Sequence, residues 1–486
     1  MGRRVVVVGN GMVGARFCDE VRRRDPDGRR VRLTVLGAER WPAYNRVLLS
    51  TVLAGGLAAR AIGLYPGGWA ARRRIDLRTG VAAVAIDRAA RVVHTDDGGL
   101  EPYDELVLAT GSRAHLPPLD GIEKDGVTAF RDLADCERIL SLARPGTRFA
   151  VLGGGLLGCE AARGLAGRGA RVTLLHRGTH LMERQIDPGA GQVLAASLRR
   201  LGVDARLGVR ATAWEPGAGI RTDGGLVAAD ALVVATGVRA ETALAADAGI
   251  AVDHGVVVDD RLATSDDRVH AVGDCAQHAG AVAGVVQPGW EQAAVLADLL
   301  TGSDPAARYR GTRGVTRLKA RDIDLAAFGD PALLTDPASD SATPAPEVIR
   351  FSDPAGGRYA ALAFAGEQVV AGAVVGLPDA AASMIQFFDG GIPIAPGDRL
   401  ALLLGRALPG AVETADPGRL PHAAVVCRCN TVTKGALVAA WRGGATDPAA
   451  LARATRATTG CGSCGDAVRG ICTWLAEADP RTEEAA

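Results

Sequence analysis

Four consecutive β-branched residues, Val5-Val6-Val7-Val8, form an apolar run near the start of the chain. Such a run predicts a strand that is buried on both faces. It leads directly into Gly9, Gly11 and Gly14, which stand at GxGxxG spacing before a helical pattern. In this motif the first glycine permits a tight turn, the second lets backbone approach a pyrophosphate, and the third lets the helix pack against the strand. The pattern therefore predicts a dinucleotide-binding strand, turn and helix.

The next apolar run, Val31 to Leu36, predicts a second strand that ends shortly before Glu39. A carboxylate at this place in a dinucleotide-binding unit typically binds a ribose hydroxyl. The segment from Trp41 to Ser50 follows, and its proline predicts a loop with a short helix at Val47–Ser50. We expect this loop to reach across the bound cofactor.

The same layout then repeats. Arg148–Leu152 predicts another buried strand, and Gly153, Gly155 and Gly158 repeat the glycine spacing. The strand after that, Arg171–Leu175, ends at His176-Arg177. Three further apolar runs end in small-residue turns, at Thr110-Gly111, at Thr236-Gly237 and at Gly273-Asp274. Two copies of one layout predict two dinucleotide sites in an α/β protein.

The region after Gly302 has a different pattern. A strand is expected at Val315–Lys319, and apolar alternation predicts an antiparallel set at Val348–Phe351, Tyr359–Phe364 and Val369–Val375. Helices are expected at Met384–Phe388 and Leu400–Leu404. We interpret this region as a small α/β domain for packing or for a homodimer contact, followed by a linker at Glu413–Pro421.

Composition narrows the class of protein. The 486 residues leave room for about three domains. The chain has 55 basic residues (lysine and arginine) and 55 acidic residues (aspartate and glutamate), so its formal net charge is zero. This balance gives no argument for nucleic-acid binding. No apolar run reaches transmembrane length and none resembles a signal peptide, so we expect a cytoplasmic protein without a membrane partner. Five scattered cysteines are expected to be core residues: Cys18, Cys136, Cys159, Cys275 and Cys472.

Four other cysteines are arranged as a possible metal site. Cys427 and Cys429 form a C-x-C pair, and Cys461 and Cys464 form a C-x-x-C pair, with two helical patterns between the pairs (Thr433–Arg442 and Pro448–Ala454). Four thiolates that come together in a small domain bind zinc or an iron–sulfur cluster. Zinc ribbons favour two C-x-x-C pairs, so the C-x-C pair favours the cluster.

The order of the two glycine motifs, the two Ala-Thr-Gly turns and the Val-Gly-Asp stretch resembles the pyridine-nucleotide–disulfide oxidoreductase superfamily, from Val5 to about Gly302. The resemblance implies two Rossmann-like, glutathione-reductase-like domains: an FAD domain at 1–112 and 240–302 and an NAD(P)H domain at 113–239. It implies that the first glycine motif binds FAD and the second binds NAD(P)H. The cofactor-binding residues would be Gly9, Gly11, Gly14, Glu39, Arg46, Thr110, Gly111, Gly153, Gly155, Gly158, His176, Arg177, Thr236, Gly237, Gly273 and Asp274. His176 and Arg177 stand where NADH-binding relatives carry a carboxylate, which predicts that NADPH is used at least as well as NADH.

Two further resemblances concern the flavin loop and the cysteines. The first glycine motif and the loop Tyr44-Asn45-Arg46 look closer still to the flavin half of assimilatory nitrite reductase large subunits and nitrate reductase electron-transfer subunits. The four cysteines resemble those of the bacterioferritin-associated ferredoxin-like 2Fe-2S domain, here at 422–476 behind the small domain at 303–412. The superfamily also implies a basic residue near the flavin that pairs with a glutamate, here Arg46 and Glu160. Family members usually carry lysine at the position of Arg46.

These patterns lead to one functional hypothesis with two alternatives. NAD(P)H would reduce FAD, and electrons would pass through a 2Fe-2S cluster to a partner, for which we expect an assimilatory nitrate or nitrite reductase. The loop from Trp41 to Ser50 has no cysteine, so disulfide chemistry at the flavin is not expected. No sirohaem region follows before Ala486, so we expect no nitrite reduction by this polypeptide itself. The alternatives are a reductase of a separate ferredoxin or rubredoxin, and a redox sensor or scaffold without turnover.

Overall fold

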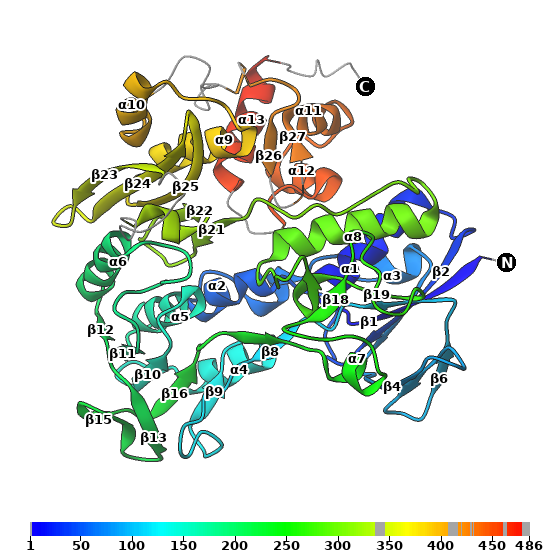
Figure 1. Cartoon of the computed structure of the whole chain (residues 1–486), viewed down its shortest axis with the longest axis horizontal. Coiled ribbons are helices and arrows are strands. Elements are labelled where there is room, and N and C mark those ends of the chain that lie inside the picture. The colour runs from blue at the N-terminus through cyan, green and yellow to red at the C-terminus, as the bar shows by residue number, and fades with distance from the viewer. Residues whose placement is uncertain are drawn as a thin grey trace, which may run out of the picture.

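The computed structural model describes residues 2–335, 346–406, 417–418, 420–427, 430, 432–459 and 464–478. Two Rossmann-like units form the lower part of the molecule in Figure 1, and a third sheet and the cysteine-containing segment lie above them. The predicted α/β class with parallel sheets is therefore confirmed.

The first unit is a five-stranded sheet with strand order β19-β7-β1-β2-β3, in which all strand pairs are parallel. Its strands are β1 (Arg3–Val8), β2 (Val31–Gly37), β3 (Ile75–Thr79), β7 (Glu105–Leu108) and β19 (Val269–Ala271). The predicted valine run is buried in β1, and Val8 pairs with Leu36 of β2. Helices α1 (Met12–Arg24) and α8 (Val286–Thr301) lie side by side next to this sheet, joined by the Arg24–Asp298 ion pair (Figure 1). Because the strands are parallel, their carboxyl ends share the edge where the first glycine motif begins.

The second unit repeats this architecture with strand order β12-β11-β10-β16-β9. Its strands are β9 (Val127–Ala129), β10 (Arg148–Leu152), β11 (Arg171–His176), β12 (Val203–Leu207) and β16 (Ala231–Val234), and its helices are α4 (Leu133–Leu142), α5 (Leu156–Ala166) and α6 (Pro188–Arg200). An antiparallel sheet of β13 (Ala211–Glu215), β14 (Gly219–Thr222) and β15 (Gly225–Ala228) extends from it. Figure 1 shows this extension at the end of the molecule far from the cysteine-containing segment.

Smaller elements join and decorate the two units. The chain crosses between them in an antiparallel ribbon of β8 (Ser112–Ala114) and β17 (Val238–Ala240). A turn at 96–99 connects β5 (Val92–Thr95) to β6 (Leu100–Pro102), beside β4 (Ala83–Asp87). The remaining short elements are η1 (Arg46–Leu48), α2 (Leu49–Leu53), η2 (Ala59–Ile62), α3 (Trp69–Arg72), α7 (Ala243–Asp247), β18 (Val256–Val258), η3 (Gly273–Cys275) and β20 (Ala276–His278).

The third sheet is antiparallel, with strand order β21-β22-β25-β24-β23. It comprises β21 (Val315–Leu318), β22 (Leu325–Phe328), β23 (Glu347–Asp353), β24 (Arg358–Ala365) and β25 (Gln368–Val375), with η4 (Pro331–Leu334), α9 (Pro378–Gly390), η5 (Pro396–Asp398) and α10 (Arg399–Leu403). The strands and helices that the sequence predicted here are confirmed. One sheet face joins the core of the second unit, where Tyr359 donates a 2.6 Å hydrogen bond to Asp187. This packing brings β21 to the pocket between the two Rossmann-like units.

We call the described residues from Leu420 to Ala478 the cysteine domain. It contains β26 (Val425–Cys427), β27 (Val432–Thr433), α11 (Lys434–Arg442), α12 (Pro448–Thr455) and α13 (Gly465–Ala478). Helices α11 and α12 were predicted, whereas α13 was not. The predicted linker at Glu413–Pro421 falls mostly outside the described residues. None of the helices in the described part of the chain is both long enough and apolar enough to cross a membrane.

Candidate functional site

A single continuous pocket of about 1720 Å³ runs from the first glycine loop to the second. A pocket for one small ligand typically measures roughly 300–1,000 Å³. The volume therefore suits two dinucleotides that meet end to end. The pocket is lined by both glycine loops and, on one side, by β21 and Lys319.

The first glycine loop has the geometry that a pyrophosphate requires. Gly9 has a φ of +116°, and a Cβ at this position would lie 2.2 Å from the carbonyl oxygen of Ala109. A Cβ on Gly14 would lie 2.0 Å from the carbonyl oxygen of Gly9, so only glycine lets α1 start this close to β1. A Cβ on Gly11 would meet nothing within 4 Å, because this residue borders the open pocket. The loop thus leaves backbone exposed at a helix N-terminus, which favours an anionic phosphate.

The second glycine loop repeats this geometry almost unchanged. Gly153 has a φ of +114°, and a Cβ on Gly158 would lie 1.8 Å from the carbonyl oxygen of Gly153. Gly155 again faces open space. The residues present therefore fit a dinucleotide at each loop.

Asp274 lies at the carboxyl edge of the first sheet, directly after the β19 strand. Its Oδ2 accepts hydrogen bonds from Ser112 Oγ and Arg131 Nη2, each 3.0 Å long. All three side chains line the pocket. Gly273, next to Asp274, donates its N–H to Gln292 of α8 over 2.7 Å. Sequence reasoning had singled out Asp274 but missed Arg131 and Ser112, because their relation to Asp274 exists only in the folded chain.

The two Ala-Thr-Gly turns border the pocket and hold neighbouring backbone. Thr110 Oγ1 donates to the carbonyl oxygen of Glu241 over 2.8 Å, and Thr236 Oγ1 donates to that of His115 over 2.6 Å. Each threonine hydroxyl thereby holds one of the two segments that cross between the Rossmann-like units. Their glycines, Gly111 and Gly237, both have positive φ and line the pocket.

Glu39 borders the pocket, as the ribose-binding hypothesis requires, and two residues of the following loop hold its carboxylate. Tyr44 donates its hydroxyl to Glu39 Oε2 over 2.7 Å, and Arg46 forms an ion pair with Glu39 Oε1. Burial raises the pKa of the Tyr44 phenol, so the hydroxyl stays a donor. Arg46 is therefore engaged at the ribose end of the first site.

The predicted pairing of Arg46 with Glu160 is wrong in this structure. Glu160 is 6% exposed at the start of α5 and accepts a 2.8 Å hydrogen bond from the backbone N–H of Lys319. Burial raises the pKa of the Glu160 carboxyl, and the Ser50 hydroxyl and the Lys319 amide and ammonium partly offset this. The superfamily resemblance implied that a basic residue of the flavin loop pairs with Glu160. In the folded chain, however, Arg46 pairs with Glu39. Lys319 comes from the third sheet, which the sequence did not place against α5.

His176 and Arg177 lie at the end of β11, and their environments differ. His176 is buried, and its Nδ1 accepts the N–H of Gly154 over 3.2 Å. Burial lowers the pKa of His176, so the ring is neutral and braces the second glycine loop. Arg177 is exposed and lines the pocket together with Arg184 and Arg210. Three arginines at this end of the pocket are the basic environment that a 2′-phosphate would need.

Two of the four candidate metal ligands are described, one from each pair. Cys427 and Cys464 are 0% and 6% exposed in the core of the cysteine domain. Asn430 Nδ2 donates to Cys427 Sγ over 3.7 Å, and the backbone N–H of Thr458 donates to Cys464 Sγ over 3.2 Å. Cys429 and Cys461 lie outside the described residues. Buried sulfurs that accept N–H donors fit thiolate ligands of an iron–sulfur cluster.

Comparison with known proteins settles the family. The family model described as pyridine nucleotide-disulphide oxidoreductase matches residues 3–296, which is 294 of the 486 residues. The chain belongs to this family. A second family model, the BFD-like [2Fe-2S] binding domain, matches residues 425–473. The predicted resemblances and the predicted cofactor set of FAD, NAD(P)H and a 2Fe-2S cluster are therefore confirmed.

The oxidoreductase is similar to enzymes of nitrate assimilation along nearly its whole length. It is 33% identical to a nitrite reductase [NAD(P)H] of Bacillus subtilis over 96% of this chain and 57% of the relative. It is also 33% identical to the assimilatory nitrate reductase electron transfer subunit of that organism, over 98% of this chain and 60% of the relative. The chain thus spans less than two thirds of either relative. Among solved structures, the covalent putidaredoxin reductase–putidaredoxin complex matches with a TM-score of 0.73 and 25% identity over 85% of this chain and 97% of that chain.

Despite the family name, the described thiols of this oxidoreductase do not form a redox pair at the pocket. Cys18, Cys136, Cys159, Cys275 and Cys472 are all buried free thiols, and none of them lines the pocket. Burial raises the pKa of Cys18 to about 12 and that of Cys136 to about 11, and also raises those of the other three. Because the thiolate is the reactive form, these cysteines are inert core residues, as predicted.

Proposed function

We propose that this chain is an NAD(P)H-dependent FAD reductase that passes electrons through a 2Fe-2S cluster to the catalytic part of an assimilatory nitrate or nitrite reductase. One observation carries the proposal. Met12 and Val13 of the first glycine loop line the dinucleotide pocket and also pack into the same apolar cluster as Cys427 and Cys464. One apolar cluster thus connects the first dinucleotide site with both described candidate ligands of the iron–sulfur cluster.

The chain supplies binding, orientation and charge for this chemistry. When bound, FAD accepts two electrons as hydride from NAD(P)H and releases them one at a time to the cluster. The two glycine loops, which line one continuous pocket, would each hold one pyrophosphate, so that the reactive ends of the two dinucleotides could meet between them. Asp274, held by Ser112 and Arg131, offers a fixed acceptor at the edge of the first sheet. Glu160 and Lys319 both line the pocket, and the Lys319 ammonium acts electrostatically on the Glu160 carboxyl, so this cation would stabilise negative charge that develops on a bound flavin.

We choose between the possible electron acceptors by the share of this chain that each group of relatives covers. The nitrite and nitrate reductase relatives match 96% and 98% of this chain, which includes the cysteine domain. Ferredoxin reductase components of dioxygenases match only 43–46% of it. A reductase that carries its own 2Fe-2S domain has no need of a separate ferredoxin, which favours direct delivery to a reductase partner. A homodimer contact through the third sheet stays a prediction.

The test compares acceptors with protein purified under anaerobic conditions. We expect NADPH oxidation with an artificial dye, and NADPH-dependent nitrate reduction when the catalytic subunit of an assimilatory nitrate reductase is added. The scaffold alternative predicts no dye reduction at all. Faster electron delivery to a rubredoxin or a plant-type ferredoxin than to the catalytic subunit would replace our proposed acceptor by the second alternative.

A further inference from the structure

Three charged side chains of α1 are buried at the contact with the cysteine domain. Arg16, Asp19 and Glu20 are 7%, 5% and 5% exposed, although they lie on the helix that begins at the first glycine loop. Buried charges are costly unless they are paired and hydrogen-bonded. Arg16 forms an ion pair with Glu20 over 2.7 Å, and Arg24 donates to Glu20 over the same distance. Two arginines of α1 thus hold one carboxylate, which faces the cysteine domain.

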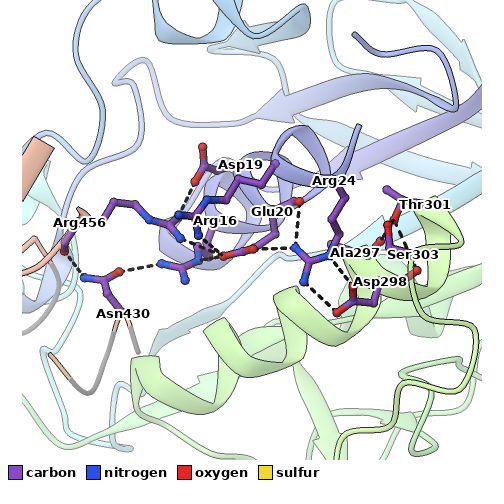
Figure 2. A network of polar contacts seen from close by, with 11 residues as sticks. Arg16, Asp19, Glu20, Arg24, Ala297, Asp298, Thr301, Ser303, Asn430 and Arg456 are labelled. Carbon is purple, nitrogen blue, oxygen red and sulfur yellow. Dashed lines mark hydrogen bonds and ion pairs between the residues drawn. The ribbon is translucent and has the colours of Figure 1, made fainter. Parts of the chain in front are cut away.

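The cysteine domain contributes a third arginine to this cluster. Arg456 caps the C-terminal end of α12, and its side chain reaches across to α1 (Figure 2). Its Nη1 donates to Asp19, and its Nη2 lies 3.0 Å from Glu20 Oε1. Burial by itself would raise the pKa of Glu20, but Arg16, Arg24 and Arg456 outweigh burial and hold that pKa at about 2. Asp19 and Glu20 therefore bind Arg456 in a buried ionic cluster, in which the Glu20 carboxylate stays charged.

The same network reaches the sulfur of a cluster ligand. Arg16 Nη1 donates to Asn430 Oδ1 over 2.7 Å, and Asn430 Nδ2 donates to the carbonyl oxygen of Arg456 over 2.6 Å (Figure 2). Asn430 is 6% exposed, and its Nδ2 also donates to Cys427 Sγ. One side chain thus connects α1, Arg456 and a cysteine ligand.

A second tie connects the other cysteine pair to the flavin loop. Asn45 Nδ2 donates to the carbonyl oxygen of Thr459 over 2.8 Å. The neighbouring Thr458 donates its N–H to Cys464 Sγ. Asn45 is 1% exposed and directly precedes Arg46, which lines the pocket. Both cysteine motifs are therefore fastened by hydrogen bonds to segments that border the first dinucleotide site.

We propose that Arg456 and Asn430 are positioning residues that hold the cysteine domain in one orientation on α1 and thereby set the rate of electron transfer from FAD to the cluster. The proposal rests on the function proposed above. The apolar contacts with Met12 and Trp290 also hold the domain, but apolar contact is non-directional, whereas the arginine–carboxylate network fixes orientation. The electrons and protons of the proposed reaction balance. One hydride brings two electrons, the cluster passes them singly to the acceptor protein, and the flavin proton returns to solvent.

The experiment follows the two steps separately by anaerobic stopped-flow absorbance in the full-length holoprotein. For Arg456→Ala, we expect flavin reduction by NADPH to stay within about twofold and cluster reduction to slow by about tenfold or more, since breaking a buried charge pair lowers the docked population. Arg456→Lys should restore part of that rate. Iron content should equal that of the unchanged protein. Amide hydrogen exchange over residues 456–459 should become faster in Arg456→Ala, which reports docking without reference to turnover.

The matched control is Arg453→Ala, because Arg453 lies on the same helix with an exposed side chain. It should change neither rate nor exchange. If Arg456→Ala loses iron, Glu20→Gln tests the network from α1, outside the cysteine domain, and should slow the same step. Cluster reduction at the unchanged rate in either variant with full iron content would overturn the positioning role. A parent protein that lacks iron, or that NADPH does not reduce, would instead overturn the proposed function.

Discussion

At the scale of the residue, the partners of Glu160 and of Arg46 indicate which side chain we expect to assist hydride transfer. Glu160 is buried at the N-terminus of α5 and contacts Lys319, one of only three lysines in the chain. Arg46 instead pairs with Glu39 at the ribose end of the first site. Reduced flavin carries negative charge, so a cation nearby lowers the barrier to its formation. We therefore expect Lys319, not Arg46, to take this role.

Lys319→Ala should slow the reduction of bound FAD by NADPH by about tenfold, the scale of one lost electrostatic contact. Arg46→Ala should instead weaken FAD binding and leave the reduction of retained FAD nearly unchanged. Stopped-flow flavin absorbance measures the rate, and flavin content after gel filtration measures binding. Lys124→Ala removes the same charge from an exposed position outside the pocket and serves as the control. A slow Arg46→Ala with full FAD content would return the role to Arg46.

Arg177 should decide between NADPH and NADH. Its guanidinium lines the pocket with Arg184 and Arg210, while His176 is occupied by the glycine loop. Arg177→Ala should lower kcat/KM for NADPH by about tenfold and change that for NADH little, because only NADPH carries the 2′-phosphate. Arg171→Ala, at the opposite end of β11, is the matched control. Equal losses with both nucleotides would show that Arg177 does not recognise the phosphate.

At the scale of the element, the two glycine loops are near copies that we expect to bind different cofactors. In both loops, a Cβ atom on the third glycine would lie about 2 Å from a carbonyl oxygen. The helix can therefore start this close to the strand only with glycine at that position. The helices α1 and α5 therefore start at equivalent places on two separate sheets. Because the two loops lie on separate sheets, a substitution can disrupt one dinucleotide site and leave the other intact.

Gly158→Ala should abolish tight NADPH binding and leave FAD in place, and Gly14→Ala should release FAD. Each substitution forces a shift of backbone, with an expected loss of about 1–3 kcal/mol in stability. Flavin content, NADPH titration by fluorescence and thermal unfolding together measure these effects. Gly67→Ala is the control, since a Cβ there meets nothing within 4 Å and Gly67 has no positive φ. Loss of FAD from Gly158→Ala would contradict the assignment of the second loop.

At the scale of the whole molecule, three of the four units lie next to one another along the path of electrons that we propose. We expect NAD(P)H to bind the second Rossmann-like unit and FAD the first. The cysteine domain packs on α1 and α8 (Figure 1). The third sheet closes the pocket from the side with β21 and Lys319. Removal of the last carrier should therefore leave the earlier steps intact.

Cys427→Ser should remove the iron while FAD stays bound and NADPH-dependent dye reduction continues. Delivery of electrons to the reductase partner should be lost, because the cluster is the proposed exit. Cys472→Ala is the control, since Cys472 is a buried thiol of the same domain and is not among the four candidate ligands. Iron and zinc analysis with visible absorption checks the result. One zinc and no iron in the unchanged protein would contradict the cluster.

The sequence by itself determined the elements and the chemistry that depends on local spacing. The valine run, the two glycine motifs and the cysteine pairs are each contiguous, so their geometry is largely set by neighbours along the chain. The central strands and helices of both glycine-motif units, the family and the cofactor set followed from them, whereas strands such as β12 and β22 and helices α4 and α6 were not predicted. Helix α13 was missed because glycine and polar residues at its start obscure its period.

Only the tertiary structure decided which distant side chains meet. Lys319 reaches Glu160 across 159 residues, Arg131 reaches Asp274 across 143, and Arg456 reaches Asp19 across 437. No local pattern encodes such pairs, because the packing of sheets and helices brings them together after the elements form. The same reason explains the wrong pairing of Arg46 with Glu160. Sequence spacing predicted that acidic and basic residues would line the cofactor site, and the packing of the units determined which of them pair.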